Sequence, residues 1–379
     1  DKGEPRLKQM DRDWIWFETW ARYAWNPDRD PMAERAYWTS VLSDMYGDDQ
    51  SAGADILQAY ESFGECAPKL LRRFGITEGN RQTMSLGMTM SQLTNPIRHM
   101  QWPDLWESHA PEGERLDLYV KREMAGEPHI GETPLDIIHD AVRHADDAIE
   151  AVNRARAHVT KNTEEFERLA SDVEAVRHMV YFYYYKVKAA IQVLMYKHKA
   201  QNDFFTGVEH LEEAAVLMEK SVESYRELTA ITEKTYLYAN SMQTPQRKVP
   251  FPNGETYKHW TDCLPEYENE LTFFKQHVAE LKSGTLPRKL QEKGDDIKPY
   301  KEAPFKVYSD NVEQHRLEKD DSIFSDGDIM IISYAEELEG LTTLRFSHKE
   351  ASEKGIAVDI ELERPSKILI GYFNDNDEQ

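Results

Sequence analysis

The chain has 379 residues, of which 40% are hydrophobic, 11% aromatic and 30% charged. This composition excludes a disordered chain, and the length predicts two or three domains of roughly 100–200 residues each. The formal net charge of −23 argues against nucleic acid and anionic membranes as partners, because phosphate binding needs clustered Lys and Arg. Two cysteines exclude a disulfide framework, and no apolar run is long enough to span a membrane.

The N-terminal part of the chain reads as an entry segment followed by two helices. Residues 1–13 are charged, begin without methionine and predict a loop that enters from something upstream. Apolar residues at helical spacing predict a helix over 14–25, which Asn26-Pro27 ends. Asp30 and Pro31 are then the N-cap and first residue of a helix that runs to about Met45.

Residues 51–129 give a less regular pattern. We expect a helix over 51–74, either whole or broken into a pair near Gly64 and Pro68. Another helix is expected over 83–93, ended by Asn95-Pro96. Prolines and glycines predict irregular structure over 99–129.

From Thr133 onward the pattern predicts long helices. Thr133 is a typical N-cap, with Pro134 at the first position and Asp136 at the third. Apolar residues then recur at threes and fours. We expect helices over about 134–152, 163–198, 207–240 and 264–282. The short connection between the second and third makes them antiparallel neighbours.

The C-terminal part predicts strands after a charged linker. About five short strands are expected, at 305–308, 328–332, 344–346, 356–362 and 368–373, and they favour a β-sandwich. The fold class is therefore mainly α, with an antiparallel helical array followed by a small β-sandwich-like domain. The expected divisions are an entry segment (1–30), short helices and loops (31–130), long helices (131–285), a linker (286–301) and a β-rich domain (302–379).

The first candidate site is the aromatic segment 14–28. All tryptophans except Trp260 lie in the first third of the chain, and rings occur around the whole circumference of the expected helix. Such a helix either offers rings to a sugar or is buried between two domains, with Glu18 and Arg22 as a structural pair. The candidate substrate-binding residues of this segment are Trp16, Glu18, Arg22, Tyr23, Trp25 and Asn26.

A second candidate is the polar turn over 77–83, which contributes Asn80 and Arg81. Its alternative interpretation is helix capping and solvation. His99, Trp102 and Trp106 either line the same cleft or pack in the interior. The aromatic run 179–185 indicates core packing, and Asp11, Asp13 and Glu18 show no spacing typical of a catalytic pair.

Cofactor and metal motifs are missing from the sequence. A Cys-x-x-Cys zinc spacing, a P-loop, a dinucleotide fingerprint and Gly-x-Ser-x-Gly do not occur. We therefore expect no metal and no cofactor, and the catalytic residues stay unknown.

The stretch Trp16–Asp28 resembles the segment that ends the barrel and opens the helical domain in α-glucuronidases of glycoside hydrolase families 67 and 115. The resemblance implies an upstream (β/α)8 barrel that carries the general acid and base, while this chain forms a wall of the sugar pocket. It also implies that Arg22 or Arg81 pairs with a uronate carboxylate. The catalytic acids of these families have no matching positions here.

The leading hypothesis is the C-terminal portion of a glycoside hydrolase acting on a polysaccharide or oligosaccharide, with uronic-acid-containing glycans as the favoured class. One alternative is a non-catalytic helical scaffold or interaction module with a β-sandwich, and another is a polysaccharide lyase. The expected partner is carbohydrate, the expected location is extracellular or periplasmic, and homo-oligomerisation is left open.

Overall fold

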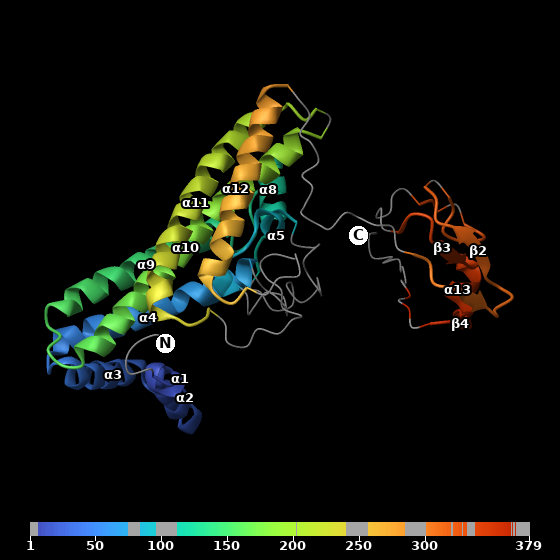
Figure 1. The fold of residues 1–379 in the computed structure, drawn as a ribbon. Coiled ribbons are helices and arrows are strands. Elements are labelled where there is room, and N and C mark those ends of the chain that lie inside the picture. The colour runs from blue at the N-terminus through green and yellow to red at the C-terminus, as the bar shows by residue number, and fades with distance from the viewer. Residues whose placement is uncertain are drawn as a thin grey trace. The chain divides into compact units, whose positions relative to one another are not determined.

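The computed structural model forms two compact units, Asp1–Leu290 and Gln291–Gln379. The first unit is helical and the second contains short strands (Figure 1). The finer division expected from the sequence stays a prediction. The structure describes residues 7–74, 84–95, 112–201, 203–239, 257–284, 301–319, 321–327, 329–331, 338–364, 366 and 368.

The helical unit begins with a short helix in the segment predicted to be a loop, followed by the two expected helices. A short α1 (Gln9–Arg12) leads into α2 (Trp14–Trp25) and α3 (Pro31–Tyr46). The Asp30 carboxylate accepts a hydrogen bond from the Ala33 amide at 2.7 Å, so it caps α3 as predicted.

One continuous helix, α4 (Gln50–Phe74), follows, so of the two alternatives the whole helix is confirmed and the break near Gly64 and Pro68 is wrong. Gly64 and Pro68 lie one turn apart, and both are exposed. The Gly64 carbonyl, which loses its amide partner at Pro68, therefore lies on a solvent-facing side of the helix. The inward side holds buried Ile56 and Leu70, and their packing stabilises the helix across the proline.

The region after α4 differs from the prediction in two places. The helix expected over 83–93 is a 3-10 turn, η2 (Met84–Leu86), and a short α5 (Met90–Thr94). They are separated by Gly87, whose φ of +97° is incompatible with a helix. The segment expected to be irregular contains α8 (Leu116–Ala125), a short helix whose few inward residues lie between glycines and prolines. His99, Trp102 and Trp106 lie outside the described residues.

Four long helices complete the unit: α9 (Pro134–Arg156), α10 (Thr163–Lys199), α11 (Val208–Thr235) and α12 (Trp260–Lys282). Thr133 and Asp136 form the expected N-terminal capping box of α9. Helix α10 packs on α9 and α11, and α11 packs on α12 (Figure 1). The prediction of long helices is confirmed, although α11 ends five residues before the expected Asn240.

The core forms two clusters of buried side chains. Phe182, Tyr183, Tyr225 and Tyr267 belong to the larger cluster, where the rings of Phe182, Tyr225 and Tyr267 contact one another edge-on. The aromatic run 179–185 thus packs in the interior, as expected, with its other tyrosines half-buried. The second cluster joins α3, α4, α9 and the first half of α10.

A buried ion pair lies within the larger cluster. The side chain of Lys186 is fully buried and its ammonium donates to the carboxylate of Glu270. The other oxygen of Glu270 accepts from the Met90 amide at 2.6 Å. The pair therefore ties α10 and α12 to the start of α5.

His129, which follows α8, contacts one residue that precedes this helix and two residues within it. His129 stacks on Tyr119, with ring centroids 4.5 Å apart, and its two nitrogens lie 2.8 Å from Glu114 and 3.0 Å from Glu123. Hydrogen bonds to Glu123 and Glu114 raise the pKa of His129.

The C-terminal unit contains two antiparallel two-stranded sheets within its described residues. Strand β1 (Phe305–Val307) pairs with β4 (Ile360–Leu362), and β2 (Glu313–Arg316) pairs with β3 (Thr342–Arg345). Helix α13 (His348–Lys354) follows β3. These elements do not confirm the expected β-sandwich. The strands expected at 328–332 and 368–373 lie partly or largely outside the described residues.

Among the described residues, none of the helices combines the length and apolar character that crossing a membrane requires.

Candidate functional site

Helix α2 lies at the edge of the helical unit and exposes its aromatic side chains. One end of α2 projects beyond α3, whereas the long helices lie side by side (Figure 1). None of its residues is buried. The exposed fractions are 60% for Trp16, 71% for Trp20 and 90% for Trp25. Large aromatic residues are seldom this exposed on a soluble surface, so this helix is the candidate site.

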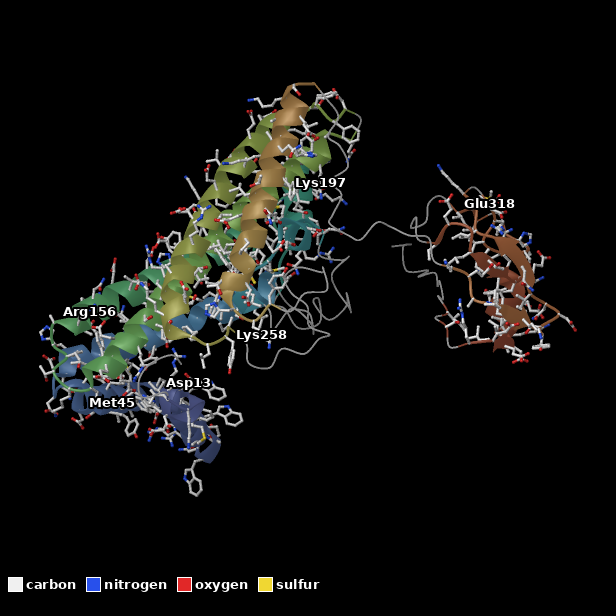
Figure 2. The ribbon with its side chains drawn as sticks, in the orientation of Figure 1. Asp13, Met45, Arg156, Lys197, Lys258 and Glu318 are labelled. Carbon is white, nitrogen blue, oxygen red and sulfur yellow. The ribbon has the colours of Figure 1, made fainter. Side chains whose placement is uncertain are left out.

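The base of α2 is anchored on α10. The Trp14 indole donates to Glu165 at 2.7 Å, and the Arg12 guanidinium lies 2.5 Å from the Asp172 carboxylate. The Tyr236 hydroxyl bonds the same carboxylate. Burial raises the pKa of Asp172, although Arg12 opposes this. Asp13, labelled in Figure 2, lies between α1 and α2, so these contacts fix the point where α2 starts.

The far half of α2 is attached to α3 through Arg22. The Arg22 guanidinium donates to both oxygens of Glu34, at 2.7 and 3.2 Å, and lies 3.5 Å from the centroid of the Tyr37 ring. Arg29 donates to Glu34 at 2.8 Å and to the Arg22 carbonyl at 3.1 Å. Hydrogen bonds from Arg22 and Arg29 lower the pKa of Glu34. The expected Glu18–Arg22 pair is therefore wrong: Arg22 pairs with Glu34, and Glu18 is exposed.

The outer side of α2 carries a stack of rings. Trp16 and Trp20 lie one turn apart with centroids 6.0 Å apart and planes 9° apart. Phe17 meets Trp16 edge-on at 5.0 Å. Tyr23 is 42% exposed. Because the rings of Phe17 and Trp20 both contact that of Trp16, the orientations of these three rings are restricted before any ligand arrives.

The C-terminal end of α2 presents Trp25 and Asn26. The Asn26 side chain accepts from the Asp28 amide at 3.1 Å, and its backbone amide donates to the Arg22 carbonyl. Asn26 thus shapes the turn into α3, and Trp25 extends from that turn. Six of the predicted site residues lie on α2 and this turn, but they do not share one side of the helix. Asn80 and Arg81 lie outside the described residues.

Sequence reasoning missed Glu34, Arg29 and Tyr37. A signal for Glu34 exists, because it lies four residues before Trp38 and so shares the inward face of α3. A carboxylate on an inward face needs a cationic partner, and that requirement points to the nearby arginines.

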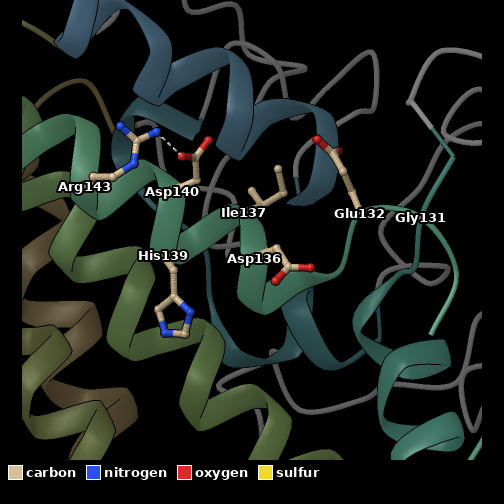
Figure 3. Close-up of a pocket in the computed structure, with 7 residues that line it drawn as sticks. All are labelled: Gly131, Glu132, Asp136, Ile137, His139, Asp140 and Arg143. Carbon is tan, nitrogen blue, oxygen red and sulfur yellow. Dashed lines mark hydrogen bonds and ion pairs between the residues drawn. The ribbon is translucent and has the colours of Figure 1, made fainter. Parts of the chain in front are cut away.

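A hollow lies at the start of α9 (Figure 3). Its volume is about 580 Å³, and its acidic side chains include Glu132, Asp136 and Asp140. Glu132 pairs with Arg72 and Arg73, and Asp136 caps α9. Although burial raises the pKa of Asp140, hydrogen bonds from Lys69 and Arg143 lower it to about 2. These carboxylates hold the helices together, so the hollow is a weak candidate for catalysis.

The described residues include no group of His, Cys, Asp and Glu arranged to hold a metal ion.

Neither a protein-family model nor a curated protein matches this chain. A solved structure does, and it is that of a GH138 enzyme targeting pectin rhamnogalacturonan II. The sequences are 40% identical over 94% of this chain, with a TM-score of 0.75. The structural neighbour is a glycoside hydrolase. This chain spans 40% of the neighbour's length. A relation to families 67 and 115 is not shown.

Proposed function

We propose that this chain is the C-terminal portion of a carbohydrate-active glycoside hydrolase that acts on a pectic polysaccharide or oligosaccharide. The observation that carries the proposal is the 40% identity, maintained over 94% of the chain, to an enzyme of that activity. Because the chain matches only 40% of the neighbour's length, the general acid and base are proposed to lie in an upstream catalytic domain. A barrel fold for that domain, a uronic-acid-containing substrate, and an extracellular or periplasmic location belong to the same proposal.

Within that enzyme, the turn between α2 and α3 is proposed to form a wall of the sugar pocket. A sugar ring offers C–H groups that pack on an aromatic face, and the indole of Trp25 is 90% exposed at a turn fixed by Asn26. Arg22 is poorly suited to bind a uronate carboxylate, because two of its nitrogens already donate to Glu34. We therefore assign Arg22 the role of holding the turn against α3.

The proposal is tested with the complete gene product, assayed for release of sugars from purified rhamnogalacturonan II. We expect hydrolysis, and we expect Trp25→Ala to lower kcat/KM by about tenfold, the loss of roughly 1.4 kcal/mol of binding. Phe273→Ala is the matched control, because Phe273 is a 49% exposed ring on α12. Absence of hydrolysis of any pectic glycan would contradict the enzyme proposal and favour a scaffold. Unchanged kcat/KM in Trp25→Ala would remove Trp25 from the pocket.

A further inference from the structure

Helix α2 has two sides with different surroundings. Successive residues of an α-helix are about 100° apart. Trp14 and Arg22 point to the array, where Glu165 and Glu34 hold them. Trp16, Phe17 and Trp20 lie on another side, within about 100° of one another. Trp25 follows Trp16 by nine residues and so lies about 180° away around the helix, on the same side as Trp14 and Arg22, where it is 90% exposed at the helix end.

We define the outer aromatic face as Trp16, Phe17 and Trp20. Its members are 60%, 36% and 71% exposed, and they form one contiguous set of ring contacts. A contiguous exposed aromatic patch on a soluble protein marks an interaction site. The helix that carries it is anchored at its start by Trp14 and near its end by Arg22. Binding therefore costs the patch little conformational entropy.

We propose that the outer aromatic face docks onto the catalytic domain of the complete enzyme. That domain would correspond to part of the neighbour's chain that lies outside the matched 40%. This inference rests on the proposed function. It is supported by length. The match includes 94% of this chain but only 40% of the neighbour's chain, so most of the neighbour has no counterpart here. It is also supported by chemistry, because aromatic residues are enriched and charged residues are depleted at the centre of protein interfaces.

Two other occupants fit less well. A sugar needs an open ring face, and the near-parallel stacking of Trp16 and Trp20 partly covers one face of each. A second copy of the chain would bring together two molecules that each carry a net charge of −23, which opposes association. The outer aromatic face and the Trp25 turn therefore have separate roles, one toward protein and the other toward glycan.

The test is hydroxyl-radical footprinting of tryptophans, read by mass spectrometry, on the 379-residue chain and on the complete gene product. In the isolated chain we expect strong oxidation of Trp16, Trp20 and Trp25. In the complete product we expect a several-fold loss of oxidation at Trp16 and Trp20, while Trp25 stays reactive until rhamnogalacturonan II is added. A Trp16→Ala/Trp20→Ala variant should lower the thermal midpoint of the complete product and leave that of the isolated chain unchanged.

Three results would overturn the proposal. In the first, Trp16 and Trp20 remain equally reactive in the complete product. In the second, sedimentation shows that the isolated chain dimerises and that the double variant does not, which assigns the face to a second copy. In the third, added glycan is what protects Trp16 and Trp20. Protection without any hydrolase activity would leave the docking inference standing while the proposed function fails, so the two are distinguishable.

Discussion

Glu270→Ala is expected to destabilise the helical unit strongly, because it leaves the charge of Lys186 without a partner. The Lys186 side chain is 0% exposed and that of Glu270 is 20% exposed. Breaking a buried pair by removing one partner costs about 3–5 kcal/mol. The partial exposure of Glu270 argues for the lower end of that range, and the Met90 amide also loses its acceptor, at about 1 kcal/mol. We therefore expect a loss of about 3–4 kcal/mol.

The assay is urea unfolding of the chain, followed by far-UV circular dichroism, which reports mainly on the helices. Glu61→Ala is the matched control, because Glu61 pairs with Arg35 at 2.6 Å while both side chains are about half exposed. Exposed pairs contribute about 0–1 kcal/mol. A double variant, Lys186→Met/Glu270→Leu, should recover most of the lost stability, since neither charge then remains buried. The reasoning is refuted if Glu270→Ala costs no more than Glu61→Ala.

The remaining predictions concern pH and glycines. The raised pKa of His129 means that its stabilising contribution is complete below the unfolded value of about 6.5 and is lost as pH rises through the folded value. His129→Asn should therefore cost more stability at about pH 5.5 than at about pH 8.5, and a pH-independent cost in urea unfolding would contradict this. Gly87→Ala should destabilise by more than about 2 kcal/mol, because a Cβ would lie 2.5 Å from the Tyr267 hydroxyl at a φ of +97°. Gly284→Ala, also at positive φ (+77°) but in open space, is the control and should cost less in the same assay. Gly64→Ala, in an exposed helix interior with open space, should stabilise by about 0.5–1 kcal/mol, and a thermal midpoint that falls would count against it.

Helix boundaries were predictable where a local signal sets them. Asp30-Pro31 and Thr133-Pro134 each supply a side-chain cap and a proline at the first helical position, and α3 and α9 begin there. At Pro68 the same reasoning left a whole helix and a broken pair open, because the propensity of one residue competes with packing along the whole inward face of α4. It failed at Gly87, where the apolar pattern continues but the backbone turns at a positive φ beside Tyr267.

The contacts of α2 show which features of the candidate site local sequence spacing does not predict. The composition of α2 predicted that its rings must be covered or must offer themselves to a ligand, and the structure shows them exposed on the described chain. Local spacing suggested that Arg22 pairs with Glu18 one turn away, since residues at i and i+4 are neighbours on any helix. Arg22 instead reaches Glu34 on the next helix, because the turn through Asn26 folds α3 back beside α2 and supplies a less exposed carboxylate together with the ring of Tyr37. A partner chosen by such a turn has no fixed spacing in the sequence. For the same reason the role of Arg22 shifts from binding a ligand toward holding the turn that presents Trp25.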